Sequence, residues 1–275
     1  MTLALAIRRF FAQSIRFWSG PTSLGFLSLK EVLIAVALLG FVRGTVDLAI
    51  YIKTPSIITW IATCLLWCFY ILSLSLSTAF LLSRFIPQSD FRQVLTMAVC
   101  LYWLIPLVPL FSLPPWELDW NLGLFAFTPY FRWIPTFTVA RSYLPLGMLV
   151  VFPVILLMAS RFMVRTTGTP WWRASVLTLA AYVLIYVYYY QWTWRAVVIA
   201  RFDKGLPPWE GLMAGFVAYS FLDHLITFLL SPVVARSFGV YPIWKCVLWA
   251  GVPLLILFVI PRVGIYSVFL GGGLP

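Results

Sequence analysis

The sequence predicts an all-α, polytopic integral membrane protein with about seven membrane-spanning helices, preceded by an amphipathic helix at the membrane interface. Of the 275 residues, 63% are hydrophobic and 10% are charged, whereas a soluble domain is about half apolar and a quarter charged. Apolar runs close to the roughly 20 residues needed to cross a bilayer recur along the chain. The chain also contains 14 Trp and 13 Tyr, and these residue types favour membrane interfaces.

The first 18 residues form the predicted amphipathic helix. On a helical wheel, Arg8, Arg9 and Arg16 fall on one side. The other side carries the apolar residues Leu3, Ile7, Phe10, Phe11, Phe17 and Trp18. A helix of this kind lies in the interface, with its basic side on anionic lipid headgroups. A Ser-Gly-Pro sequence then breaks the helix, so we expect residues 1–20 to form one unit and residues 21–275 a single transmembrane domain.

The predicted spans follow this break. They lie near residues 31–52, 56–83, 93–113, 143–161, 174–194, 211–231 and 246–261. The second run is long enough to tilt or to extend past the bilayer. The last run is short and contains Pro253, so the number of spans is six if that run does not cross.

Positive charge is divided unequally between the two predicted sides of the membrane. Eleven Lys and Arg residues fall on the side that holds the N-terminus and the loops 84–92, 161–173 and 232–245, and seven fall on the other side. The positive-inside rule therefore predicts a cytoplasmic N-terminus, in what we expect to be a bacterial inner membrane. The net charge of +11 is scattered between apolar runs, which favours contact with anionic lipid and argues against a nucleic-acid partner.

The segment GFVRGTVDLAIY places charge inside the first predicted span. Arg43 lies near its middle and Asp47 lies one turn further on. A charge at the bilayer centre costs about 2.5–3.5 kcal/mol on insertion scales, so we expect it to face the protein interior and to find a partner. Gly40 and Gly44 form a GxxxG pattern that permits close approach of another helix. The charges are interpreted either as a structural clamp between helices or as a functional buried site.

The sixth predicted span offers further partners. It carries a second GxxxG pattern and two ionisable residues: Gly211, Gly215, Asp223 and His224. With the predicted topology, Arg43 and Asp223 differ in depth by roughly 5 Å. We therefore predict that Arg43 pairs with Asp47 or with Asp223. His224 is the only histidine. An interior residue whose hydrogen bonds are satisfied is a simpler interpretation than a residue that transfers protons.

A polar entry, a tyrosine and a proline mark the third predicted span, SDFRQVLTMAVCLYWLIPL. The positions concerned are Phe91, Arg92, Gln93, Tyr102 and Pro106. The later segment PWWRASVLTLAAYVLIY is a basic entry into another span. Together these segments resemble the Yip1 domain family of polytopic membrane proteins, over about residues 56–192. The resemblance implies a non-enzymatic role, with eukaryotic members acting in vesicle trafficking with small GTPases, and it supplies no catalytic residues.

The functional prediction is a non-enzymatic protein, without cofactor or metal, that organises a membrane assembly or a partner protein. The sequence has no HExxH, GxSxG, P-loop or Rossmann glycine pattern, and Cys64 and Cys68 are expected to act as small apolar residues. The alternative is a transporter or permease subunit. Its path would be lined by the candidate charge cluster Arg43, Asp47, Asp223 and His224. An intramembrane lipid enzyme ranks third.

Overall fold

The computed structural model describes residues 2–20, 25–51, 57–107, 138–198 and 208–259. Some side chains within these ranges lie outside the description, including those of Asp47 and of residues 208–222. The predictions that concern Asp47, Gly211 and Gly215 are therefore not tested by the structure.

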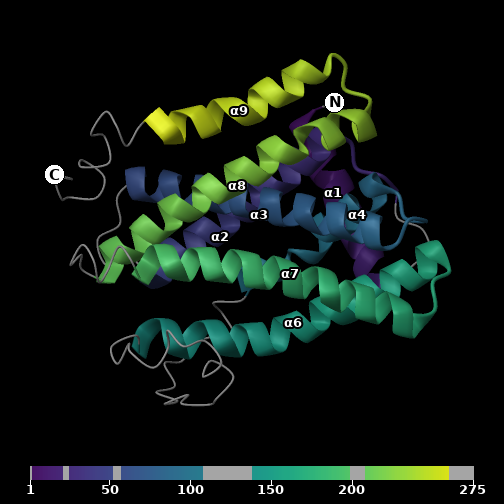
Figure 1. Cartoon of the computed structure of the whole chain (residues 1–275), viewed down its shortest axis with the longest axis horizontal. Coiled ribbons are helices and arrows are strands. Elements are labelled where there is room, and N and C mark those ends of the chain that lie inside the picture. Colours follow the sequence, from purple (N-terminus) through teal and green to yellow (C-terminus); the bar gives the residue numbers. More distant parts are fainter. Residues whose placement is uncertain (1, 21–24, 52–56, 108–137, 199–207, 260–275) are drawn as a thin grey trace.

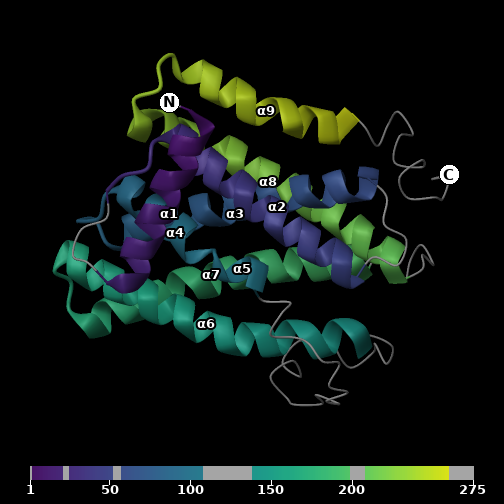
Figure 2. The ribbon, with the colours of Figure 1, turned by 180° about the vertical axis from the view of Figure 1, so that it is seen from behind.

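Every regular element in the described residues is a helix, as the all-α prediction requires. The helices are α1 (Leu3–Ser19), α2 (Leu29–Tyr51), α3 (Ile57–Phe85), α4 (Phe91–Leu101), α5 (Leu104–Leu107), α6 (Thr138–Thr167), α7 (Trp171–Val198), α8 (Pro208–Phe238) and α9 (Ile243–Val259). The long helices lie side by side, and α1 crosses one end of the bundle at a steep angle to them (Figures 1 and 2). The predicted N-terminal helix is thus present, and each predicted span but one overlaps a long helix.

The exception is the third predicted span, near residues 93–113, which is wrong as a continuous helix. Helix α4 ends at Leu101, and the four-residue helix α5 follows after a turn. Pro106 lacks a backbone N–H, so it cannot donate the helical hydrogen bond to the carbonyl of Tyr102. That carbonyl instead accepts a bond from Ile105 N at 3.0 Å, in a tighter turn. The 11 residues of α4 rise only about 16 Å, roughly half of a bilayer core.

Helix α4 fills the centre of the bundle at the end that α1 crosses. All of its residues from Val94 to Leu101 are buried, and it packs against α1, α2, α3, α6 and α8. A short helix that is buried on every side needs apolar residues around its whole circumference, and the sequence VLTMAVCL meets this need with one exception, Thr96. Among the described side chains, α4 thus contributes a continuous stretch of the hydrophobic core.

One end of the bundle collects the basic residues. We call it the basic end: α3, α6 and α8 finish there, and α4, α7 and α9 begin there (Figure 1). Its Lys and Arg residues are Arg8, Arg9, Arg16, Lys30, Arg84, Arg92, Arg161, Arg165, Arg173, Arg236 and Lys245. These are the same eleven residues that the sequence assigns to one side of the membrane. Among the described residues, the carboxylates at this end belong to Glu31 and Asp90.

The GxxxG pattern of α2 brings this helix against α3. A Cβ atom on Gly40 would lie 2.4 Å from Cys68 Sγ and 2.6 Å from Cys68 N, and one on Gly44 would lie 2.7 Å from Cys64 Cα. Each thiol also donates to a carbonyl of α2, Cys64 Sγ to Phe41 O at 3.7 Å and Cys68 Sγ to Ala37 O at 3.8 Å. The two cysteines thus act as the small residues of a close helix contact, which α2 could not make with a side chain in place of either glycine.

We expect the substitution Gly44→Ala to lower the free energy of unfolding by about 1–3 kcal/mol. The added methyl group would clash with backbone atoms of Cys64, which cannot move away as a flexible side chain can. Thermal unfolding of the purified protein in detergent measures this change. Gly251→Ala in α9 is the matched control, since its methyl group would meet only the Phe228 ring, at 3.3 Å. Equal unfolding temperatures for Gly44→Ala and the wild type would contradict the close contact of α2 and α3.

Candidate functional site

The interior of the bundle is mostly apolar and contains a set of buried polar side chains. Buried polar or charged side chains on the long helices and α4 include Arg43, Ser73, Ser75, Thr78, Thr96, Ser160, Thr178, Asp223, His224 and Ser231. The outward side chains of the same bundle are large and apolar, among them Leu33, Phe41, Ile61, Leu65, Leu157, Val176, Leu184, Leu229, Trp249 and Leu255. A water-soluble bundle places mainly polar and charged side chains on its outer face.

Arg43 occupies the centre of this interior. Its side chain is 6% exposed, as we expect of a charge in an apolar span. Its Nη1 donates a hydrogen bond to the carbonyl of Ile105 in α5 at 2.9 Å, and its guanidinium carbon lies 4.4 Å from the centre of the Trp67 ring in α3. One side chain of α2 therefore joins α3 and α5 through a charge-assisted hydrogen bond and a cation–π contact.

The sequence explains why the Ile105 carbonyl needs a donor from elsewhere. In a continuous helix this carbonyl would accept a bond from the N–H of residue 109, but residue 109 is proline and has no N–H. A buried carbonyl without a hydrogen-bond donor is costly, so a donor from another part of the protein is favoured. Arg43 meets this need. The structural interpretation of Arg43 as a clamp between helices thus has a specific atomic basis.

Asp223 and His224 lie on α8, against the opposite side of α3. Asp223 is 1% exposed, and its Oδ1 accepts a hydrogen bond from Ser73 Oγ at 2.5 Å. The His224 ring stands edge-on to Phe69 with 3.7 Å between ring centres, and its Nδ1 has no hydrogen-bond partner among the described residues. Together with Ser231, these two neighbours are the buried polar side chains in the described part of α8.

The described contacts of Arg43 and Asp223 lie at different levels of α3. Arg43 lies over Trp67 and Asp223 accepts from Ser73, so the two levels are separated by roughly 9 Å along the helix axis. Pairing of Arg43 with Asp47 or with Asp223 stays a prediction.

The residues that resemble the Yip1 family have clear structural roles around α4. Asp90 caps α4, accepting from Arg92 N at 2.7 Å, and the Arg92 guanidinium lies 3.6 Å from the same carboxylate. The Tyr102 hydroxyl forms a buried hydrogen bond with Thr78 Oγ1 at 2.6 Å and donates to the Tyr182 hydroxyl at 3.5 Å. Phe91 begins α4, Tyr102 follows its last residue, and Pro106 lies in the next helix, α5.

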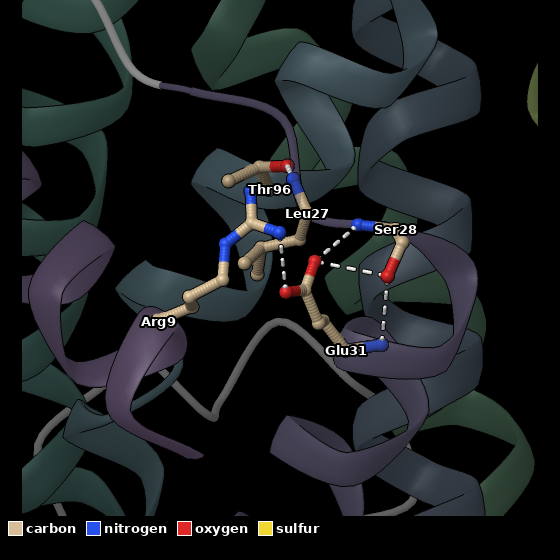
Figure 3. A network of polar contacts seen from close by, with 5 residues as sticks. All are labelled: Arg9, Leu27, Ser28, Glu31 and Thr96. Atoms are coloured by element: carbon tan, nitrogen blue, oxygen red, sulfur yellow. Dashed lines mark hydrogen bonds and ion pairs between the residues drawn. The ribbon is translucent and has the colours of Figure 1, made fainter. Parts of the chain in front are cut away.

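A second polar group, which we call the clasp, joins α1 to the start of α2. It consists of Arg9, Ser28 and Glu31 (Figure 3). Glu31 accepts from Ser28 N at 2.7 Å and Ser28 Oγ at 2.9 Å, while Glu31 N donates to Ser28 Oγ at 3.3 Å. This is a capping box at the start of α2. Arg9 Nη1 reaches the fully buried Glu31 carboxylate at 3.0 Å and so adds α1 to the cap.

Further hydrogen bonds fix α1 and the segment after it to α4. Leu27 N donates to Thr96 Oγ1 at 3.1 Å (Figure 3). The Trp18 indole donates to the carbonyl of Cys100 at 3.3 Å. The predicted apolar side of α1 is therefore divided. Phe10 and Phe17 are buried within the protein, whereas Phe11 and Leu3 are exposed.

Sequence reasoning missed the clasp although its signal was present. Ser28-Leu-Lys-Glu31 has the S-x-x-E spacing of a capping box and stands immediately before an apolar run. The participation of Arg9 could not be predicted from the sequence, because it depends on how α1 packs against the start of α2. No group of three or more His, Cys, Asp or Glu residues that could hold a metal occurs within the described part of the chain.

Comparison with known proteins gives no relative for this chain: no family model, no curated protein and no solved structure matches it.

We expect Arg43→Met to destabilise the protein by about 1–3 kcal/mol, because it removes the hydrogen bond to the buried Ile105 carbonyl while keeping an apolar stem of similar length. Arg84→Met is the matched control. Arg84 is exposed in the last turn of α3, where its guanidinium lies 5.4 Å from the centre of the Phe80 ring, and we expect a change within about 0.5 kcal/mol. Equal losses of unfolding temperature in Arg43→Met and Arg84→Met would contradict the role of Arg43 as a clamp between helices.

A double-mutant cycle tests the predicted ion pair. If Arg43→Met and Asp223→Asn show a coupling free energy above about 1 kcal/mol, the pair is established.

We expect Arg9→Gln to destabilise the protein by about 1 kcal/mol, because it leaves the buried Glu31 carboxylate without its counter-charge, while the 52% exposure of the Arg9 side chain limits the loss. Arg8→Gln is the control, since it removes the same charge from an exposed neighbouring position. Unfolding temperature and proteolytic release of α1 are the measurements. If the two variants behave alike, the clasp does not hold α1.

Proposed function

We propose that this chain is a polytopic integral membrane protein of the bacterial inner membrane, with the basic end in the cytoplasm. We further propose that it organises a membrane assembly or partner protein and catalyses no reaction. The observation that carries the proposal is the apolar outer surface of the long helices, together with the polar groups that are buried among apolar side chains inside the bundle. Such a surface is stable in hydrocarbon and prone to aggregate in water.

Helix length supports the same proposal. Helices α2, α3, α6, α7 and α8 contain 23 to 31 residues and so rise roughly 35 Å or more, which exceeds a bilayer core of about 30 Å. By composition alone, Trp67–Phe85 is the single segment within the described side chains that is both long and apolar enough to cross a membrane. Because a core helix of a soluble protein passes that test too, the pattern of the surface carries more weight than the composition.

The basic end supports the orientation. Eleven Lys and Arg residues gather there, as the positive-inside rule requires of a cytoplasmic face. Helix α1 crosses this end (Figure 2). It exposes both basic and apolar side chains, including Arg16, Phe11 and Ile15. That combination suits a helix at the level of anionic headgroups.

Helix α9 supports the organising role. It packs against α8 and exposes a broad apolar flank that comprises Trp244, Leu248, Trp249, Val252 and Leu255. Trp249 is 80% exposed. Tryptophan is enriched where proteins bind one another, so this flank suits a second membrane helix. The residues that resemble the Yip1 family point to the same kind of non-enzymatic role.

One observation favours the alternative, a transporter or permease subunit. Asp223 and His224 are adjacent and buried, and His224 Nδ1 has no hydrogen-bond partner among the described residues. Buried ionisable neighbours of this kind occur along proton and ion paths. A transport path would have to be open to water at the level of Ser73, which bonds to Asp223.

Cysteine labelling tests the orientation. In a cysteine-free background, we expect Ser19→Cys, Gln88→Cys and Pro170→Cys to react with a membrane-impermeant maleimide in inverted vesicles and not in intact spheroplasts, because all three positions are exposed at the basic end. Labelling of two of the three in spheroplasts would overturn the cytoplasmic assignment.

The same approach separates the organiser from the transporter. We expect Ser73→Cys to resist a charged methanethiosulfonate reagent from both sides of the membrane, because Ser73 is fully buried. Gln88→Cys shows that the reagent is active. Reaction at position 73 would reveal a hydrated path to Asp223 and would favour transport over the organising role.

A further inference from the structure

We propose that Arg161 and Arg165 form a binding site for a phosphate group at the basic end, where the last turns of α6 meet the end of α1. The proposal rests on the proposed membrane embedding, because that embedding places this end among lipid headgroups. The ligand class is a phosphate ester, and the source that the location favours is an anionic phospholipid.

The site is built around Gly20, which follows α1. Gly20 has a φ of 85°, the left-handed conformation that glycine adopts without strain at a helix end, and its N–H donates to Arg16 O at 3.1 Å. A Cβ atom at this position would lie 2.8 Å from Arg161 Nη2 and 3.1 Å from Arg165 Nη1. The two guanidinium groups therefore converge beside Gly20, where a side chain on residue 20 would press against both of them.

Helix geometry sets this convergence. Arg161 and Arg165 are four residues apart on α6 and so share a face. Arg165 Nη1 donates to the carbonyl of Gly20, which fixes one guanidinium against the end of α1. Arg161 is half-buried, so its position is also constrained by the surrounding protein.

The charges at this point are not balanced by the described part of the protein. Its carboxylates at the basic end, Glu31 and Asp90, already pair with Arg9 and Arg92. Two adjacent guanidinium groups repel each other, and an anion that bridges them removes the repulsion. Each guanidinium presents a planar pair of N–H donors that matches two phosphate oxygens. Two such groups side by side therefore favour phosphate, which has several acceptor oxygens, over an anion such as chloride, which has one acceptor atom.

The neighbouring residues indicate the source of the phosphate. Helix α7 begins a few residues after Arg165 with Trp171 and Trp172, which are 48% and 69% exposed. Exposed tryptophans mark the headgroup level of a bilayer. A phosphate at that level belongs to a lipid, so phosphatidylglycerol is the appropriate probe.

The test uses the full-length protein in neutral detergent, with phosphatidylglycerol titrated in and the rise in unfolding temperature recorded. We expect Arg161→Gln/Arg165→Gln to weaken the apparent affinity by about tenfold or more. The charge-matched control is Arg84→Gln/Arg236→Gln, two exposed last-turn arginines of α3 and α8, for which we expect a change within about twofold. Equal weakening in both double variants would overturn the site and leave only general attraction.

Two further arms complete the test. If inorganic phosphate stabilises the wild type as well as phosphatidylglycerol does, and the site variant loses this effect, the site binds phosphate but the lipid source is wrong. If the Gln variant fails to fold, Arg161→Lys/Arg165→Lys keeps the charge and removes the planar pairs of N–H donors, and unchanged affinity would overturn the proposal. Vesicle flotation separately reports membrane embedding: a chain that floats without lipid preference refutes the site alone, and a chain that does not float refutes the proposed function.

Discussion

Arg43 supplies a hydrogen bond that the chain around α5 cannot supply for itself. Pro109 has no N–H to offer the Ile105 carbonyl, and the guanidinium of Arg43 donates to it at 2.9 Å. This bond depends on the close contact between α2 and α3. Because Gly40 and Gly44 have no side chains, α2 lies directly on Cys64 and Cys68, and Trp67, between those cysteines, lies beneath the guanidinium. The charge of Arg43 within the apolar helix α2 thus has a structural reason. Gly40 and Gly44 bring α2 close to α3, and Pro109 leaves the Ile105 carbonyl without its helical donor.

The basic end is organised by helix termini rather than by a separate domain. Glu31 and Ser28 cap the start of α2, Asp90 caps the start of α4, and each carboxylate also pairs with an arginine. Since these pairs use the carboxylates described there, the remaining arginines give this end a net positive charge. That charge is the physical basis of both the proposed orientation and the proposed phosphate site.

The long helices could be predicted from the sequence, whereas the contacts between them could not. Apolar runs of about 20 residues predicted the long helices, because a run of that length is visible in the sequence and corresponds to a helix of about 30 Å. The length of α4 was misjudged because an apolar run does not reveal whether lipid or protein surrounds it. Pro106 and Pro109 carried the relevant signal, since each removes a helical donor.

In the candidate site too, some features could be predicted from the sequence and others could not. Burial of Arg43 followed from the cost of an exposed charge in an apolar layer, and the close approach of α2 to another helix followed from its GxxxG pattern. The acceptor on Ile105 could not be predicted, because it is a backbone atom 62 residues away in sequence. The clasp between Arg9 and Glu31 likewise depends on the path of the chain between α1 and α2.

The central claim is that the apolar outer surface of the long helices faces lipid, and the accessibility of spin labels tests it most directly. Nitroxides would be placed at Leu65 on α3 and Leu184 on α7, which are 52% and 53% exposed, and at Gln88 in the loop before α4. In reconstituted vesicles, the account predicts frequent collisions with oxygen and few with a water-soluble nickel chelate at Leu65 and Leu184, and the reverse at Gln88. Nickel accessibility at Leu65 and Leu184 equal to that at Gln88 would contradict it.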